Sequence, residues 1–438
     1  MNDNNTIEEK PLISVAPKKR TLFFIIMYGL FLFDFISRVG INSIFPIIQG
    51  DLGLSDSQVG MMGSVVLFGM GVLVLPVSFL GEKYSPKRAI NLSALVWSIG
   101  TLLSGMANSF GMLIASRFLV GSGNSAYAPL SNSLITSMYS KKDWGKKIGI
   151  YNTAMTLGMA LGAIVFANLA NNFGWRMAFY TVGVISLLLT VASLALPDPK
   201  KILDAQYDEA SSYEKNEKHV EQNRVDLKKV LHVVVNNKSL LGVCVGASLG
   251  ALVLQGILSW LSIFFVREVG LSVSFSATLI SVIALVAALG YPIGGTIMDK
   301  WYVKDKRCRV FLPAICLSIA FVSLVVGFHF KVIPAIFVGA FCLTTANTSY
   351  HVATQELVPS WFKSISYGVY VLFIQLLGAV GPLVIGHLSE AFGLLTALTV
   401  LPCLLLVAIS VFLLTSRNYI QDFDHARTLE HEAAHQNV

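Results

Sequence analysis

Charged residues are scarce in this chain. Only 13% of its 438 residues are Asp, Glu, Lys or Arg, whereas 54% are hydrophobic. An ordinary soluble domain carries roughly 25% charged residues. A soluble fold of this composition would leave far too much apolar surface exposed to water. The composition therefore excludes a soluble globular protein.

Cysteine is scarce, and the common chemical motifs are lacking. The five cysteines are scattered, without a CxxC pair: Cys244, Cys308, Cys316, Cys342 and Cys403. We expect reduced thiols, with no metal site and no disulfide framework. The phosphate-binding pattern Gly-x-x-x-x-Gly-Lys-Ser/Thr is missing, which argues against work driven by ATP. No nucleophile–base pair stands in the apolar segments, so an enzyme is the least favoured class, and we predict no cofactor.

The apolar residues gather in long blocks. Each block has about 20 residues or more, the length that an α-helix needs to cross a hydrocarbon core roughly 30 Å thick. Twelve blocks are present, at about 21–48, 57–81, 89–108, 110–138, 146–170, 175–196, 239–266, 273–300, 309–329, 332–356, 364–388 and 393–416. We therefore predict an all-α membrane protein with twelve transmembrane helices. The first block is long and lacks a small-residue cleavage site, so we expect it to be retained as a helix.

The basic residues are distributed unevenly between the two sides of the predicted membrane segments. If both termini are cytoplasmic, the tails and loops on that side hold 27 of the 32 Lys and Arg residues. The opposite side has Arg176, Arg267 and Lys331, while Arg38 and Arg117 lie inside apolar blocks. This positive-inside asymmetry predicts a multi-pass inner-membrane protein with both termini cytoplasmic. It also explains the net charge of +7, which we do not interpret as nucleic-acid binding.

A long polar segment, residues 197–238, divides the blocks into two sets of six. Its mixed charge and low hydrophobicity are typical of a flexible linker, and an amphipathic helix is expected near Val225–Val235, along the membrane surface. The predicted organisation is an N-terminal tail over 1–20, a six-helix bundle over 21–196, this cytoplasmic linker, a second six-helix bundle over 239–416 and a cytoplasmic C-terminal tail over 417–438.

The two halves also repeat in sequence. Three stretches of the first half match the second half at a constant offset of 219 residues. The matches are Gly149-Ile150-Tyr151 with Gly368-Val369-Tyr370, Gly162 with Gly381, and Phe173-Gly174 with Phe392-Gly393. Agreement in one register across the same pair of helices predicts two similar bundles, related by an axis along the membrane normal.

The loop after the second block carries a family signature. It reads Gly81-Glu82-Lys83-Tyr84-Ser85-Pro86-Lys87-Arg88. This resembles the motif G-x-x-x-D-R-x-G-R-R of the major facilitator superfamily, with Glu82 and Lys83 in the Asp-Arg positions and Ser78 in place of the leading glycine. The second half has a closer copy, Gly295-Thr296-Ile297-Met298-Asp299-Lys300. The resemblance, which covers nearly the whole membrane region, implies two pseudo-symmetric six-helix bundles with a substrate site at their interface.

Further stretches resemble particular branches of that family. The fourth block has Arg117-x-x-x-Gly121-x-Gly123, similar to the family's helix-4 pattern. The spinster branch, which moves lysolipids and related amphiphiles, is resembled by Trp260 to Ser272, by Lys304-Asp305-Lys306-Arg307, by Leu357-Val358-Pro359 and by Leu388-Ser389-Glu390. The organic anion symporter branch shares Phe173-Gly174-Trp175-Arg176 and a basic residue in helix 1.

The chain departs from those branches at the proton-carrying positions. Their helix 1 usually has an adjacent Asp-Arg pair, whereas this chain has Ser37-Arg38 with an acid one turn earlier, at Asp34. Asn124 stands where helix 4 of the spinster branch often has Glu. The familiar carboxylates are thus displaced or missing, and Asp34 is the acid that remains in helix 1.

Three ionisable residues lie within the blocks of the first half: Asp34, Arg38 and Arg117. A charge near the bilayer centre costs about 2.5–3.5 kcal/mol on insertion scales, so it must face protein or water. Asp34 and Arg38 share a helix face, because they are four residues apart. One interpretation is a cavity in which the arginines bind an anionic group and Asp34 pairs with them or carries a proton. The other is a structural Asp34–Arg38 pair, with Arg117 bracing the helices.

Polar residues within other apolar blocks complete the candidate site. We expect substrate contacts from the helix-4 and second-half positions Asn124, Tyr127, Gln255, Asn347 and Gln375. His351 is a candidate proton carrier, although a histidine of this kind can equally be a packed, hydrogen-bonded residue. A conformational gate is predicted at the cytoplasmic ends of helices 2 and 8, from Glu82, Lys83, Lys87, Arg88, Asp299 and Lys300. There, acids can cap helices and pair with basic loops.

The resemblance implies a secondary active transporter. We predict that it moves a small anionic or amphipathic, lysolipid-like solute across the inner membrane by alternating access, with proton coupling. The alternatives are a proton-coupled symporter of a hydrophilic organic acid and a transport-inactive sensor on the same fold. The expected partners are a small-molecule substrate, a proton or other coupling ion and the lipid bilayer. We expect a monomer and no nucleic acid.

Overall fold

The structure is a computed structural model. It describes residues 17–125, 127–140, 143–196, 198, 237–359 and 362–436, and these residues contain helices and no strand. Most of the predicted linker 197–238, including the helix expected near Val225–Val235, and most of the predicted tail 1–20 lie outside the described residues.

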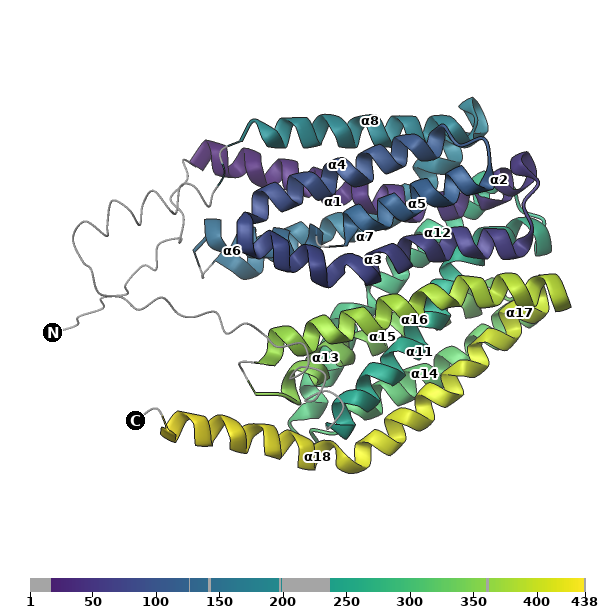
Figure 1. The fold of residues 1–438 in the computed structure, drawn as a ribbon. Coiled ribbons are helices and arrows are strands. Elements are labelled where there is room, and N and C mark those ends of the chain that lie inside the picture. The colour runs from purple at the N-terminus through teal and green to yellow at the C-terminus, as the bar shows by residue number, and fades with distance from the viewer. Residues whose placement is uncertain are drawn as a thin grey trace.

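The first half of the chain forms one helical bundle (Figure 1). Its helices are α1 (Pro17–Ser43), α2 (Phe45–Leu52), α3 (Asp56–Tyr84), α4 (Pro86–Gly105), α5 (Phe110–Asn124), α6 (Tyr127–Met138), α7 (Trp144–Phe173) and α8 (Trp175–Leu194). These eight helices exceed the six predicted segments because two of the segments are each divided into two helices. The segment α2 follows α1 directly, and α5 and α6 together make up the predicted fourth block.

The second half forms the other bundle. Its helices are α11 (Lys238–Ile263), the π-helix η2 (Phe264–Glu268), α12 (Val273–Ala288), α13 (Gly290–Tyr302), α14 (Cys308–His329), α15 (Ile333–Glu356), α16 (Lys363–Phe392), α17 (Leu394–Val400), the 3-10 helix η4 (Leu401–Cys403) and α18 (Leu404–Gln436). Here α11 continues into η2, α12 into α13, and α17 through η4 into α18. The described helices thus group into the twelve predicted segments.

Nine spans among the described residues are long and apolar enough to cross a membrane. The remaining segments are α4, α5 with α6, and α15. The helices α4 and α15 are more polar, and α5 and α6 are short pieces of one interrupted segment. The α5/α6 and α15 segments carry five of the nine residues predicted to bind substrate or carry a proton, and these polar residues weaken their hydropathy signal.

The predicted repeat appears in the helix boundaries. Helices α7 and α16 both have 30 residues, and their first and last residues are 219 positions apart. Each ends before a glycine with a backbone φ of 85°, Gly174 and Gly393, and this left-handed conformation favours glycine. A Cβ at Gly162 would lie 3.2 Å from Ile36 of α1, and one at Gly381 would lie 2.1 Å from the carbonyl of Leu252 in α11. The same helix pairs therefore pack closely in both halves.

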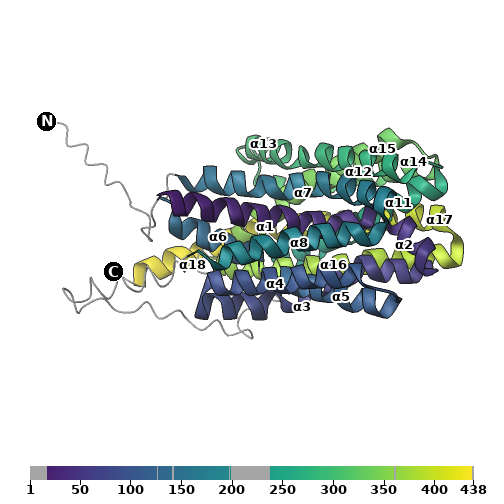
Figure 2. The ribbon, with the colours of Figure 1, turned by 90° about the horizontal axis from the view of Figure 1, so that it is seen from above.

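The long helices of both bundles run along one direction (Figures 1 and 2). We call the end that carries α2 and α17 the far end, and the opposite end, where α1 begins and α18 finishes, the near end. The two halves meet mainly where α3 packs on α16 and α7 packs on α12. Within the described part of the chain, the hydrogen bonds and ion pairs that join the halves lie at the far end or in the middle of these helices.

Helix α18 continues beyond the predicted second bundle, so the predicted tail over 417–438 is helical as far as Gln436. This extension packs on the near end of its own half. Asp422 accepts a hydrogen bond from the backbone N–H of Ser239 at 2.9 Å, at the start of α11. The Tyr419 hydroxyl lies 3.5 Å from Glu356, which forms a two-point ion pair with the buried Arg309. The extension thus fastens α11, α14 and α15 together.

Candidate functional site

A cation from the first half and an amide from the second half meet at one atom between the bundles. Arg38 of α1 donates from Nη1 to the Sδ atom of Met70 in α3, at 3.2 Å. Gln375 of α16 donates from Nε2 to the same sulfur, at 3.6 Å. The Arg38 guanidinium also lies over the ring of Phe35, 4.0 Å from its centroid. Two of the predicted substrate-binding residues are therefore brought together across the interface.

Asp34 and Arg117 lie deeper in the first half. Their exposed fractions are 3% and 1%. The Arg117 guanidinium donates to the backbone carbonyl of Ser37 at 3.4 and 3.5 Å and lies 6.0 Å from the centroid of Phe179. It therefore links α5 with α1 and α8, which is the geometry of a residue that braces helices. Neither Arg38 nor Arg117 forms an ion pair with Asp34 within 4.0 Å in the described structure.

Several polar atoms in this interior have no hydrogen-bond partner. They are Oδ1 of Asp34, Nε of Arg117 and both amide atoms of Asn124. Buried polar groups are nearly always hydrogen-bonded, and a buried one without a partner costs about 1–3 kcal/mol. Such a cluster in the middle of a membrane bundle is where water, an ion or a polar substrate group would be bound.

Tyr127 is packed rather than open. Its side chain is 1% exposed, its hydroxyl donates to the Met27 carbonyl at 3.2 Å, and its ring stacks on Phe31. Phe31 also stacks on Tyr151, with ring centroids 4.6 Å apart. Tyr127 therefore belongs to an aromatic stack with Phe31 of α1 and Tyr151 of α7, and its role in substrate binding stays a prediction.

In the second half, two predicted residues, Asn347 and His351, gather around Tyr370, and a third, Gln255, lies apart. The Tyr370 hydroxyl is 3.2 Å from Oδ1 of Asn347, and the ring of His351 lies 5.2 Å from the ring of Tyr370. His351 is thus half-buried in an aromatic group. Gln255 of α11 packs beside Gly378 of α16, where a Cβ would lie 3.4 Å from Cγ of Gln255. The roles of these residues in binding and proton transfer stay predictions.

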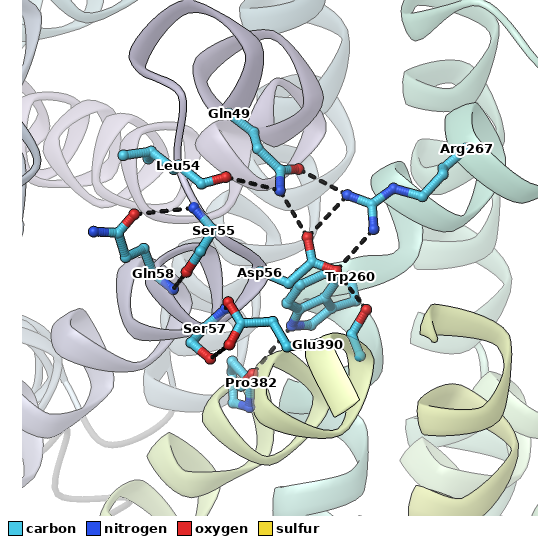
Figure 3. Close-up of polar contacts among 11 residues, drawn as sticks. Gln49, Leu54, Ser55, Asp56, Ser57, Gln58, Trp260, Arg267, Pro382 and Glu390 are labelled. Carbon is cyan, nitrogen blue, oxygen red and sulfur yellow. Dashed lines mark hydrogen bonds and ion pairs between the residues drawn. The ribbon is translucent and has the colours of Figure 1, made fainter. Parts of the chain in front are cut away.

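A polar network closes the far end of the interface (Figure 3). Asp56, the first residue of α3, binds Arg267 through both carboxylate oxygens, at 2.8 and 2.9 Å. It also accepts from Ser389 of α16 at 2.5 Å and from Gln49 at 2.7 Å. An acid in the first turn of a helix is stabilised by the helix dipole. One carboxylate therefore holds α2, α3, η2 and α16 together.

A second contact lies beside it. Glu390 of α16 accepts from the backbone N–H of Ser57 at 3.0 Å and from its hydroxyl at 2.5 Å, and His387 lies 2.9 Å from that hydroxyl. The helices approach closely here, because a Cβ at Gly60 would lie 2.5 Å from the Pro382 carbonyl. We call these residues and those around Asp56 the far-end network. The sequence alone did not predict this network, although Arg267 is one of the few basic residues on that side.

Among the described side chains, the residues of the predicted near-end gate form no hydrogen bond or ion pair between the halves. The side chains of Glu82 and Lys83 lie outside those described. The Lys87 ammonium binds the Leu196 carbonyl, and Arg88 lies 3.6 Å from Asp198, so both contacts stay within the first half. Asp299 and Lys300 of α13 are exposed, and neither forms a hydrogen bond or ion pair with a described residue. The gating role of the six residues stays a prediction.

The Phe-Gly-Trp-Arg stretch braces the far end of the first half. Asp51 of α2 accepts from Nε1 of Trp175 at 2.8 Å and from Arg176 at 2.9 Å. The Trp175 N–H and the Arg176 guanidinium hold the pKa of that carboxyl below its usual range. Arg176 also donates to the Ala107 carbonyl at 3.2 Å. The motif that the sequence shares with organic anion symporters thus ties α8 to α2 and to the loop that follows α4.

Comparison with protein families agrees with this architecture. Residues 27–382 match the model of the Major Facilitator Superfamily. The chain belongs to this family. The superfamily fold comprises twelve membrane helices in two pseudo-symmetric bundles, and the predictions of fold and family are confirmed. This chain is accordingly a multi-pass membrane transporter protein and not an enzyme.

Two relatives of this chain are named as probable transporters of organic acids. The chain is 22% identical over 338 residues to the probable L-galactonate transporter of Escherichia coli (strain K12), which covers 75% of this chain and 74% of that protein. It is 24% identical over 414 residues to the probable galactarate/D-glucarate transporter of Bacillus subtilis (strain 168), which covers 88% of this chain and 90% of that protein.

Solved structures support the same fold. A bacterial homologue of the human lysosomal transporter spinster, in an inward-facing and unoccupied conformation, aligns with a TM-score of 0.81 at 20% identity, over 93% of this chain and 99% of that one. A D-xylose–proton symporter aligns with a TM-score of 0.69 at 14% identity, over 90% of this chain and 97% of that one.

Proposed function

We propose that this superfamily member is a secondary transporter of a small hydrophilic organic acid, of the sugar-acid class. The observation that carries the proposal is the position of Arg38. Its guanidinium lies between the halves and contacts a thioether and an aromatic ring, without a carboxylate partner among the described residues. A cation held this way within a membrane bundle is suited to bind an anionic group of a substrate.

The organic acid is favoured over a lysolipid for two reasons. The two relatives compared above are named for galactonate and for galactarate and D-glucarate. In addition, the interior near Arg38 has unpartnered polar atoms on Asp34 and Asn124, which the hydroxyl groups of a sugar acid could satisfy and an acyl chain could not. The lysolipid remains the second candidate, because the fold closely matches a spinster homologue.

The proposed orientation of the protein in the membrane follows from the distribution of its basic residues. With 27 of the 32 basic residues on the side of the termini, we place the near end in the cytoplasm and the far end outside. We infer that the structure is the state closed to the outside by the far-end network, because the hydrogen bonds and ion pairs that join the halves among the described residues lie at the far end or in the middle. Alternating access requires the far-end network to break while contacts form between the near-end residues Lys87, Arg88, Asp299 and Lys300.

Proton coupling is assigned to Asp34. The carboxyl is buried, and its Oδ1 has no hydrogen-bond partner. It lies within electrostatic reach of Arg38 and Arg117, so its proton and a bound anion influence each other. His351 is the second candidate in the other half, where it lies in the aromatic group beside Tyr370.

Replacing Asp34 with Asn is expected to uncouple transport from the proton gradient. In proteoliposomes, Asp34→Asn should lose accumulation of labelled galactarate under an imposed pH gradient but retain exchange of labelled for unlabelled galactarate. The matched control is Asp51→Asn, which changes a carboxylate of the far-end brace and should keep gradient-driven accumulation. Gradient-driven accumulation by Asp34→Asn at the wild-type level would contradict the assignment.

The substrate class is tested by a binding screen on the purified full-length chain. Thermal stability is measured with galactarate, galactonate, short monocarboxylates and lysophospholipids. Stabilisation by the sugar acids alone supports the proposal, and stabilisation by lysophospholipid alone overturns it in favour of the spinster-like substrate. Galactarate uptake into proteoliposomes then separates a transporter from a sensor that binds without moving its ligand.

A further inference from the structure

Met70 occupies an unusual place in the interface. Its sulfur accepts hydrogen bonds from two side chains that belong to different halves, Arg38 at 3.2 Å and Gln375 at 3.6 Å. The backbone of α3 is fixed at this level, because a Cβ at the neighbouring Gly71 would lie 2.8 Å from Leu376 and 3.4 Å from Cβ of Gln375. The thioether therefore stands at a defined point between the bundles.

A thioether is a poor partner for these donors. Its sulfur is a weak acceptor, whereas a guanidinium and an amide N–H bind best to a carboxylate or carbonyl oxygen. In the described structure Arg38 has no other hydrogen bond or ion pair and otherwise contacts the face of Phe35. The N–H groups of Arg38 and Gln375 thus both point at one position, and that position is occupied by a weak acceptor, the Met70 sulfur. Methionine has three rotatable side-chain bonds, so it can leave that point without backbone movement.

We propose that Met70 is a placeholder for the substrate's carboxylate. In the empty transporter the Sδ atom occupies the position of a carboxylate oxygen. When the acid arrives, the side chain of Met70 swings aside, and the carboxylate binds Arg38 from the first half and Gln375 from the second. This inference rests on the proposed function and deepens it: one carboxylate of the substrate bridges the two halves at this point. The bridge can form only when the two halves are close together at the level of Met70. Substrate binding should therefore favour the state in which the halves are in contact there.

A carboxylate built into the chain tests the position directly. In Met70→Glu, the new side chain should take the substrate's place between Arg38 and Gln375. Without any added solute, the purified full-length variant is expected to melt at a higher temperature than the wild type, because the half-buried Arg38 guanidinium gains a carboxylate partner. Galactarate affinity should fall about tenfold or more, because the internal carboxylate competes at high effective concentration.

Matched variants separate this effect from general damage. Met70→Gln has nearly the same shape as the glutamate variant but supplies a neutral carbonyl oxygen in place of a carboxylate, so it should gain clearly less thermal stability than Met70→Glu. Met70→Leu removes the sulfur and keeps the apolar bulk, so it should bind galactarate at least as well as the wild type. In the double variant Met70→Glu with Arg38→Ala, the gain in melting temperature should disappear, because the internal carboxylate loses its cation.

The outcomes are distinct. A lower melting temperature for Met70→Glu, or a loss of galactarate binding in Met70→Leu as large as that in Arg38→Ala, overturns the placeholder. The thermal measurement needs no substrate, so it is independent of the proposed substrate class. If wild type binds no sugar acid while Met70→Glu is stabilised through Arg38, the proposed substrate class fails and the carboxylate position at residue 70 is supported.

Discussion

Arg38→Ala is expected to abolish binding and uptake of the sugar acid while the protein still folds. Truncating one partner of a desolvated, hydrogen-bonded charge pair costs about 2–5 kcal/mol, which corresponds to a loss of affinity of roughly 30-fold to several thousand-fold. The fold should survive, because in the empty state Arg38 gives up only a thioether contact and a contact with Phe35. Calorimetric titration with galactarate and uptake into proteoliposomes measure the two effects.

Two further variants give this experiment its specificity. Arg38→Lys keeps the charge but not the planar fork of donors, so it should retain weak binding. Arg176→Ala removes a guanidinium that pairs with Asp51 at the far end of the same half, 2.9 Å from its carboxylate, and should leave galactarate affinity unchanged. Wild-type affinity in Arg38→Ala, or an equal loss in Arg176→Ala, would show that Arg38 does not bind the anion.

The difference between Arg38 and Arg117 was not visible in the sequence. Both are basic residues within apolar blocks, and their helices run in opposite directions at similar depth. The structure separates them, since Arg38 reaches the interface and contacts Met70, whereas Arg117 is buried against Ser37 and Phe179 within one half. Position along a helix predicts depth, but the facing side depends on how the helices are rotated, which packing determines.

The fold was predictable because its signals are long and periodic. Apolar blocks of membrane length gave the twelve segments, and the matched glycines gave the repeat that places the ends of α7 and α16 at one offset. Steric need explains those glycines: Gly162 and Gly381 lie where a neighbouring backbone leaves little or no room for a side chain. A close backbone approach of this kind requires glycine at one particular position, so it can be recognised from the sequence alone.

The far-end network was harder to predict, because it is built from residues far apart in the chain. Asp56 and Arg267 are separated by 211 positions, and Ser57 and Glu390 by 333. Each of these residues alone looks like an ordinary loop or helix-cap residue. The π-helix at Phe264–Glu268 also has no sequence signature here, although it carries Arg267 and such irregular turns often occur at functional positions. Met70 likewise reads as a core methionine until the two donors around it are seen.

Gly60→Ala is expected to force the far end open. The added Cβ would lie 2.5 Å from the carbonyl oxygen of Pro382, which belongs to a helix backbone and cannot turn away. Overpacking of this kind costs about 1–3 kcal/mol, which changes the ratio of the two states by roughly 5- to 150-fold. The strain is confined to the state in which α3 and α16 are in contact, so the population should shift to the state open at the far end. Because each cycle passes through both states, uptake should fall about tenfold.

The distance between spin labels at Asn172 and Ala391 reports the shift. These exposed residues occupy equivalent positions in the two halves, at the far ends of α7 and α16, and the exposed Cys403 is replaced with Ser to avoid labelling it. Gly60→Ala should lengthen the distance. Gly50→Ala is the control, because a Cβ at Gly50 meets nothing within 4 Å and the helical residue there tolerates alanine. If Gly60→Ala and Gly50→Ala gave the same distances and the same uptake, the close packing of Gly60 against Pro382 would not be what holds the far end closed, and the polar contacts of the far-end network would have to do so.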